Sequence, residues 1–115
     1  MTIHLISDSQ SSQVSSFLKD YLSRFFSSKF KFSLSNYQLV HQEYWTWDEL
    51  FSIGKEVRSR QKRVSADDFF VVLVSGENEH NWFAAFDLED PCVGFLQTTG
   101  WEKFELNQPN FAIIS

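Results

Sequence analysis

The chain has 115 residues, and 15 acidic side chains against 10 lysines and arginines give it a formal net charge of −5. This length favours a single domain, residues 1–115, and the negative charge argues against a surface that binds DNA or RNA non-specifically. No stretch approaches the roughly 20 apolar residues of a membrane span, and the N-terminus lacks the features of a secretory signal. The single cysteine, Cys92, can close no internal disulfide, so we expect a cytoplasmic protein.

The first third of the chain is predicted to form a strand, a helix and a second strand. Thr2–Ser7 is short and apolar, which indicates a strand. Apolar residues then recur at helical spacing opposite a polar face, which predicts an amphipathic helix whose first free N–H groups bond to Asp8 and Ser9. Its apolar face consists of Val14, Phe17, Leu18, Tyr21, Leu22, Phe25 and Phe26. Residues 29–34 alternate between polar and apolar, which predicts a half-exposed strand near an edge.

A second helix is predicted after residues 37–44, which fit either a strand or a loop. Thr46 and Glu49 stand at the spacing of a capping box, in which each side chain bonds to the backbone N–H of the other residue. Apolar residues continue at helical spacing as far as Val57. A cluster of four cations follows, where positive charge favours the helix dipole. Its members are Arg58, Arg60, Lys62 and Arg63.

The second half of the chain is predicted to consist mainly of strands. The uninterrupted apolar run over 69–75 indicates a central strand buried on both faces. After the polar loop 76–81, segments 82–87 and 92–99 indicate a hairpin, and residues 111–114 a last strand. The order β-α-β-α-β, followed by an antiparallel hairpin and a terminal strand, predicts an α/β domain with a mixed sheet. Its first three strands should be parallel, and the hairpin should add an antiparallel edge.

The loop after the central strand is one candidate site, because ligands bind at the carboxyl ends of strands in open α/β sheets. Glu77, Glu79 and His80 could supply metal ligands or an acid–base pair. No second His or Cys lies at a ligand spacing from them, so a solvated loop is the favoured interpretation. His4 and His41 are isolated in the sequence, and His4 is expected to be a packed, hydrogen-bonded residue of an apolar strand.

The common signatures of catalysis and nucleotide binding are absent from the sequence. It contains no Gly-x-Ser-x-Gly, no Gly-x-Gly-x-x-Gly and no Gly-x-x-x-x-Gly-Lys. Cys92 would need a base and a depressed pKa to act as a nucleophile, and a small apolar role is favoured for it. We therefore expect no catalytic residue, no metal and no cofactor, and we predict that the chain is not an enzyme.

Aromatic residues make up 17% of the chain, which is abundant for so small a protein, and they could build much of its core. Because aromatic side chains are favoured at binding hot spots, Trp82, Phe83, Phe86 and Trp101 are the predicted contacts with a partner, with core packing as the alternative for each. An exposed strand at 111–114 could also pair with a partner. The sequence thus predicts a protein–protein interaction domain that binds another protein or a second copy of itself, as an inhibitor or a component of a bacterial or phage defence system would.

The cationic cluster Arg58–Arg63 supports an alternative function. Four positive side chains could bind phosphate or nucleic acid, although a solvated helix end is the favoured interpretation of such a cluster. The negative net charge also disfavours nucleic acid. Steep salt dependence of binding would distinguish this alternative from a protein–protein contact.

Residues 67–101 resemble the sheet of zincin-like metallopeptidases of the archaemetzincin and metzincin type. In these enzymes a buried strand ends in a polar loop, an aromatic-rich antiparallel edge strand follows, and the next strand is similar to 93–100 here. The preceding β-α-β-α order is also similar. Such enzymes carry His-Glu-x-x-His on a later helix, whereas no histidine follows His80. The resemblance therefore implies a zincin-like half domain, either a degenerate module kept for binding or a fragment that completes a zinc hydrolase site with another chain.

Overall fold

The structure is a computed structural model that describes residues 1–26, 29–61 and 64–98. Its centre is a five-stranded sheet in the order β2-β1-β4-β7-β6, accompanied by a two-stranded sheet of β3 and β5. The strands are β1 (Thr2–Ser7), β2 (Lys31–Leu34), β3 (Tyr44–Trp45), β4 (Phe69–Val74), β5 (Glu77–Asn78), β6 (Ala84–Phe86) and β7 (Val93–Gln97), and the helices are α1 (Ser12–Phe26) and α2 (Trp47–Arg60).

The predicted α/β class and mixed sheet are confirmed. β2, β1, β4 and β7 are parallel, and β6 pairs antiparallel with β7 to form the last strand of the sheet. The predicted terminal strand at 111–114 and the predicted contact residue Trp101 lie outside the described residues. In the described part of the chain, no helix is long and apolar enough to cross a membrane.

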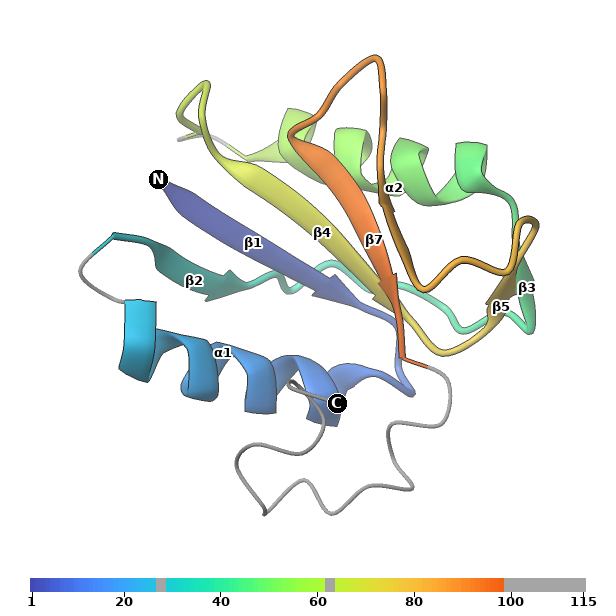
Figure 1. Cartoon of the computed structure of the whole chain (residues 1–115), viewed down its shortest axis with the longest axis horizontal. Helices are drawn as coiled ribbons and strands as arrows, with labels where there is room; N and C mark the ends of the chain where they lie inside the picture. Colours follow the sequence, from blue (N-terminus) through green and yellow to red (C-terminus); the bar gives the residue numbers. More distant parts are fainter. Residues whose placement is uncertain (27–28, 62–63, 99–115) are drawn as a thin grey trace.

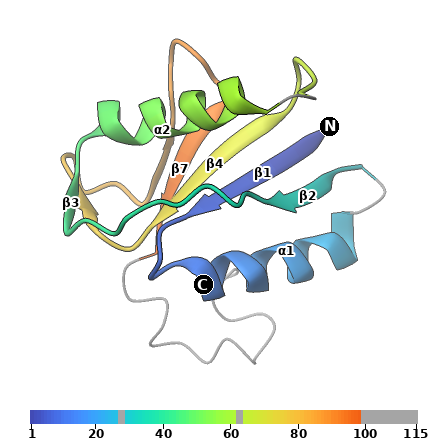
Figure 2. The same cartoon turned by 180° about the vertical axis from the view of Figure 1, so that it is seen from behind.

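The two helices cover opposite faces of the sheet (Figure 1 and Figure 2). On the α1 face, Leu5 and Leu73 pack against Val14 and Leu18 of the helix. The α2 face holds the larger cluster of buried side chains: Ile6, Trp45, Leu50, Phe51, Val57, Phe70, Val72, Val74, Val93 and Phe95. β4 contributes to both clusters, which confirms that it is the central strand buried on both sides.

Local signals in the sequence explain where α2 begins. The Thr46 hydroxyl accepts a hydrogen bond from the Glu49 N–H, at 3.2 Å, and the Glu49 carboxylate accepts one from the Thr46 N–H, at 2.9 Å. The predicted capping box is therefore present, and the Thr46 N–H bond lowers the pKa of Glu49. Further along, Gly54 lets α2 approach the sheet, because a Cβ there would lie only 2.6 Å from the Val93 Cγ1.

Residues 37–44, for which the sequence allows a strand or a loop, are mostly irregular, with one parallel bridge between Asp8 and Leu39 before β3 begins. Two other segments differ from the sequence-based prediction. The loop 76–81 is not simply solvated, since it contains β5 and the buried side chain of Asn78. The strand predicted at 82–87 is shortened to β6, and just before it the Trp82 N–H donates a hydrogen bond to the Asn78 side chain.

Candidate functional site

The outer side of β6 is an open sheet edge. The Phe83 carbonyl accepts a hydrogen bond from the Gln97 N–H, and the Asp87 N–H donates to the Val93 carbonyl. Because backbone groups in an antiparallel pair point alternately towards and away from the partner strand, Ala84 and Phe86 direct their N–H and C=O groups outward. No strand of the described sheet lies beyond β6. Two outward residues are therefore available to pair with an added strand.

Three aromatic side chains from the sequence-based prediction surround this edge. Trp82, Phe83 and Phe86 are 59%, 59% and 57% exposed. The Trp82 ring packs edge-on against Trp47 with centroids 5.3 Å apart, and the Phe86 ring lies 6.2 Å from Phe69. These contacts orient two of the rings while leaving more than half of each exposed. The side chains are thus surface groups and not members of the core, as the interaction hypothesis requires.

A groove of about 610 Å³ lies between α2 and the loops on either side of β6. Its lining residues are Trp47, Asp48, Phe51, Ser52, Lys55, Glu79, His80, Phe86, Asp87, Leu88 and Glu89. The Lys55 ammonium is 2.8 Å from the Asp87 carboxylate. This contact raises the pKa of Lys55 and lowers the pKa of Asp87. The single lysine of the groove therefore already has an acidic partner.

Two of the three predicted loop residues, Glu79 and His80, line this groove. The Glu79 carboxylate accepts a hydrogen bond from the Trp47 N–H at 2.8 Å, so it satisfies a free donor in the first turn of α2. The His80 ring packs edge-on against Trp47 with centroids 4.5 Å apart, and Glu77 is exposed in β5. Among the described residues, no group of three or more His, Cys, Asp or Glu side chains could hold a metal ion.

The two described members of the cationic cluster are already paired with acids. Arg58 makes a bidentate ion pair with Asp90, and this contact lowers the pKa of Asp90. Arg60 lies 2.9 Å from the Glu56 carboxylate and 5.5 Å from the centre of the Tyr37 ring. Arg60 also lines a cavity of about 490 Å³ beside residues 35–38. Lys62 and Arg63 lie outside the described residues.

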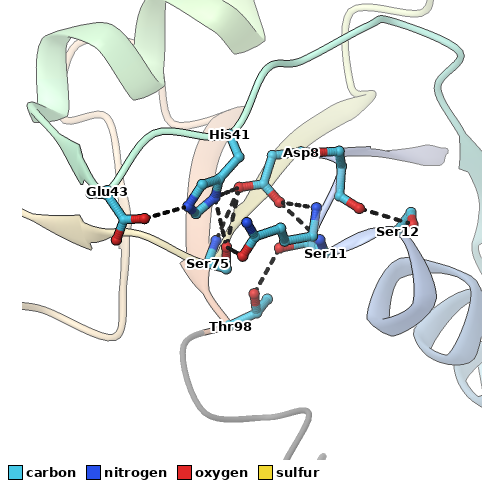
Figure 3. Close-up of polar contacts among 9 residues, drawn as sticks. Asp8, Ser11, Ser12, His41, Glu43, Ser75 and Thr98 are labelled. Carbon is cyan, nitrogen blue, oxygen red and sulfur yellow. Dashed lines mark hydrogen bonds and ion pairs between the residues drawn. The ribbon is translucent and has the colours of Figure 1, made fainter.

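A polar cluster that the sequence did not predict lies at the carboxyl ends of β1 and β4 (Figure 3). Asp8 is fully buried and accepts hydrogen bonds from the backbone N–H groups of Ser11, at 2.8 Å, and Ser75, at 3.2 Å. Its Oδ2 is 3.1 Å from Nδ1 of His41, and the Ser75 hydroxyl is 2.9 Å from the same nitrogen. Close by, the hydroxyls of Ser11 and Thr98 are 2.7 Å apart.

The cluster contains Ser, His and Asp but lacks the arrangement of a catalytic triad. In a triad the nucleophile and the acid contact opposite nitrogens of the imidazole, whereas Ser75 and Asp8 both contact Nδ1 of His41. The other nitrogen, Nε2, faces Glu43 at 3.4 Å. The hydrogen bond with Asp8 raises the pKa of His41. Through the contacts of His41 with Asp8 and Ser75, the cluster joins the segment before β3 to the sheet.

Two further residues considered in the sequence are His4 and Cys92. His4 is buried, its Nε2 is 3.2 Å from the Asp68 carboxylate, and its ring stacks on Phe70. The expectation of a packed, hydrogen-bonded His4 is confirmed. Cys92 is a free, half-buried cysteine. His41 is isolated in the sequence but contacts Asp8 and Ser75 in the structure. The signal available for this cluster is that Asp8 and Ser75 each follow an apolar strand.

Comparisons with known proteins support the fold. No protein-family model matches the sequence, and no curated protein is similar to it in sequence. The structure is similar to that of a zinc-dependent peptidase from Methanocorpusculum labreanum, with a TM-score of 0.60 and 10% sequence identity. The match covers 84% of this chain but 63% of the peptidase, so the chain spans less than two thirds of that enzyme. The fold is therefore α/β with a zincin-like resemblance in structure.

Proposed function

We propose that this chain is a non-catalytic, zincin-like interaction domain that binds an extended segment of a partner protein along the outer side of β6. The observation that carries the proposal is the open edge at Ala84 and Phe86, with exposed aromatic rings at Trp82, Phe83 and Phe86 beside it. An extended segment added to a sheet edge gains affinity from main-chain hydrogen bonds and specificity from its side chains. Aromatic residues next to that edge supply the hot-spot contacts.

The length of β6 sets the expected strength of this interaction. A three-residue strand offers backbone pairing at two outward residues, which is typical of edges that avoid indiscriminate pairing. Backbone hydrogen bonds alone would then hold a partner weakly, because each contributes only about 1 kcal/mol net. We therefore expect micromolar binding that depends strongly on the aromatic side chains. We further propose that this contact takes place in the cytoplasm, in keeping with a single cysteine.

The proposal is tested by selecting ligands from a phage-displayed library of random peptides of about 12 residues, which span roughly 40 Å when extended. Binding of enriched peptides is then measured by fluorescence anisotropy to the wild type and to Ala84→Pro. Proline removes the outward N–H of residue 84, and proline is tolerated where an edge N–H faces solvent. We expect Ala84→Pro to weaken binding at least about tenfold, because it removes a backbone hydrogen bond to the peptide and adds steric hindrance.

The matched control is Leu34→Pro at the opposite edge of the sheet. The Lys31 and Ser35 N–H groups donate towards β1, so the alternation places the Leu34 N–H outward as well. Leu34→Pro should leave peptide binding unchanged. Enriched peptides whose affinity is equal for both proline variants would show that β6 is not the binding edge.

A second candidate function rests on the similarity to the zinc-dependent peptidase. The chain could be a subunit that completes a zinc hydrolase site with another polypeptide. The described residues do not fit a zinc site by themselves, and the sequence lacks His-Glu-x-x-His, so the ligands would have to come from the other chain. Zinc analysis of the complex purified from its native host tests this candidate, and a metal-free complex would count against it.

A further inference from the structure

The groove between α2 and the loops beside β6 is lined by several acidic side chains. Asp48, Glu79 and Glu89 are exposed residues of its lining. Within the part of the chain that the structure describes, none of the three forms an ion pair. The one lysine of the lining, Lys55, is paired with Asp87. Among the described residues, the groove therefore presents three carboxylates without an ion-pair partner next to the open edge of β6.

Apolar groups also line the groove. Trp47 and Phe51 pack edge-to-face with their centroids 6.0 Å apart, and Leu88 is 97% exposed. Long basic side chains lay their aliphatic stems along apolar surface while their charged ends reach polar groups. Aromatic and aliphatic surface combined with acids fits lysine or arginine better than an uncharged residue.

We infer that the partner segment is basic, and that one or more of its Lys or Arg side chains enter this groove while its backbone follows β6. This inference rests on the proposed function. Charge complementarity disfavours the other occupant, a second copy of this chain, because pairing two identical edges would bring two sets of Asp48, Glu79 and Glu89 together. The net charge of −5 adds to that repulsion.

The test uses the peptides enriched from the random library and a pair of charge variants. Asp48→Asn with Glu89→Gln removes two groove charges and spares Glu79, which bonds to the Trp47 N–H. The control is Asp20→Asn with Glu43→Gln, which changes the net charge equally at residues outside the groove lining. We expect enrichment of Lys and Arg in the selected peptides. At about 50 mM salt, the groove pair should weaken binding about tenfold and the control pair less than about twofold.

Two results would overturn the inference while leaving the edge proposal intact. One is the enrichment of neutral or acidic peptides that are sensitive to Ala84→Pro. The other is an equal loss of affinity for the groove pair and the control pair, since that would reflect net charge alone. A homodimer in sedimentation equilibrium that dissociates with Ala84→Pro would assign the edge to a second copy and also overturn it. If no enriched peptide responds to Ala84→Pro, the proposed function itself fails.

Discussion

Asp8 is fully buried, and its two carboxylate oxygens accept hydrogen bonds from residues on three different segments. These segments are the turn before α1, the chain before β3 and the end of β4. A buried carboxylate is tolerated only when such donors replace its lost hydration. A single side chain thus fixes the relative positions of elements that are far apart in the sequence.

Replacing Asp8 by asparagine should destabilise the fold by about 3 kcal/mol, because the amide keeps the volume but loses the charge that its donors satisfy. Urea unfolding followed by circular dichroism measures the change. Asp20→Asn, on an exposed position of α1, should change the free energy of unfolding by less than about 0.5 kcal/mol. Similar effects of the two variants would contradict the role assigned to Asp8.

His41 should make stability depend on pH. Its pKa is raised above the ordinary value of 6.5, first by the hydrogen bond with Asp8 and to a lesser extent by Glu43. The folded state therefore holds the proton more tightly than the unfolded state. The resulting stabilisation is fully present below pH 6.5 and is lost as the pH rises through the higher, folded pKa.

The variant His41→Gln should consequently be less stable than the wild type by about 1 kcal/mol more at pH 5.5 than at pH 8.5. Glu43→Gln should keep most of the pH dependence of the wild type, since Asp8 is the larger cause of the raised pKa. Equilibrium unfolding at pH 5.5 and pH 8.5 gives the difference in unfolding free energy between each of the two variants and the wild type. A destabilisation by His41→Gln that is the same at both pH values would disprove this account.

Among the elements, α2 depends on how closely it approaches β7. A Cβ at residue 54 would overlap the Val93 side chain. Gly54→Ala should therefore destabilise the protein by about 1 to 3 kcal/mol through overpacking, although alanine is the better helix former by about 1 kcal/mol. Val93→Ala in the same chain should recover part of the loss in thermal unfolding. If Gly54→Ala stabilised the protein, the close approach of α2 would be wrong.

The beginning of α2 gives a second test at this scale. Thr46→Ala should lower the free energy of unfolding by about 1 kcal/mol, since it removes the hydroxyl that accepts from the Glu49 N–H. Thr46→Ser keeps that hydroxyl and should lose less than half as much. Chemical denaturation of the two variants compares them, and equal losses would mean that the hydroxyl is not what caps the helix.

Elements with local signals were predictable from the sequence, whereas the contacts of His41 in the polar cluster were not. The spacing of apolar residues predicted α1, and the capping box predicted the start of α2, because both patterns lie within a few residues. The contacts of His41 with Asp8 and Ser75 join residues 33 and 34 positions apart. No local pattern reports such a separation, and none could show that Trp82 and Phe86 are exposed instead of buried.

The whole molecule explains why polar and aromatic side chains gather where they do. The chain passes from β1 through α1 to β2 on one side, and later elements extend the sheet on the other side of β1. This reversal lies between β1 and β4, and their carboxyl ends hold Asp8 and Ser75. In open α/β sheets such a point is a crevice for ligands, and here the contacts of His41 with Asp8 and Ser75 lie at it. We propose the open edge at β6 as the surface for a partner.

Amide hydrogen exchange followed by NMR tests that central claim most directly. The exchange of Ala84 and Phe86 is measured with and without a peptide selected for binding. Both N–H groups point away from β7, so pairing with an added strand should slow their exchange by about tenfold or more. Ala85, which already faces β7, should change less. Unchanged exchange at Ala84 and Phe86 in the saturated complex, or protection at β2 instead, would contradict binding along the outer side of β6.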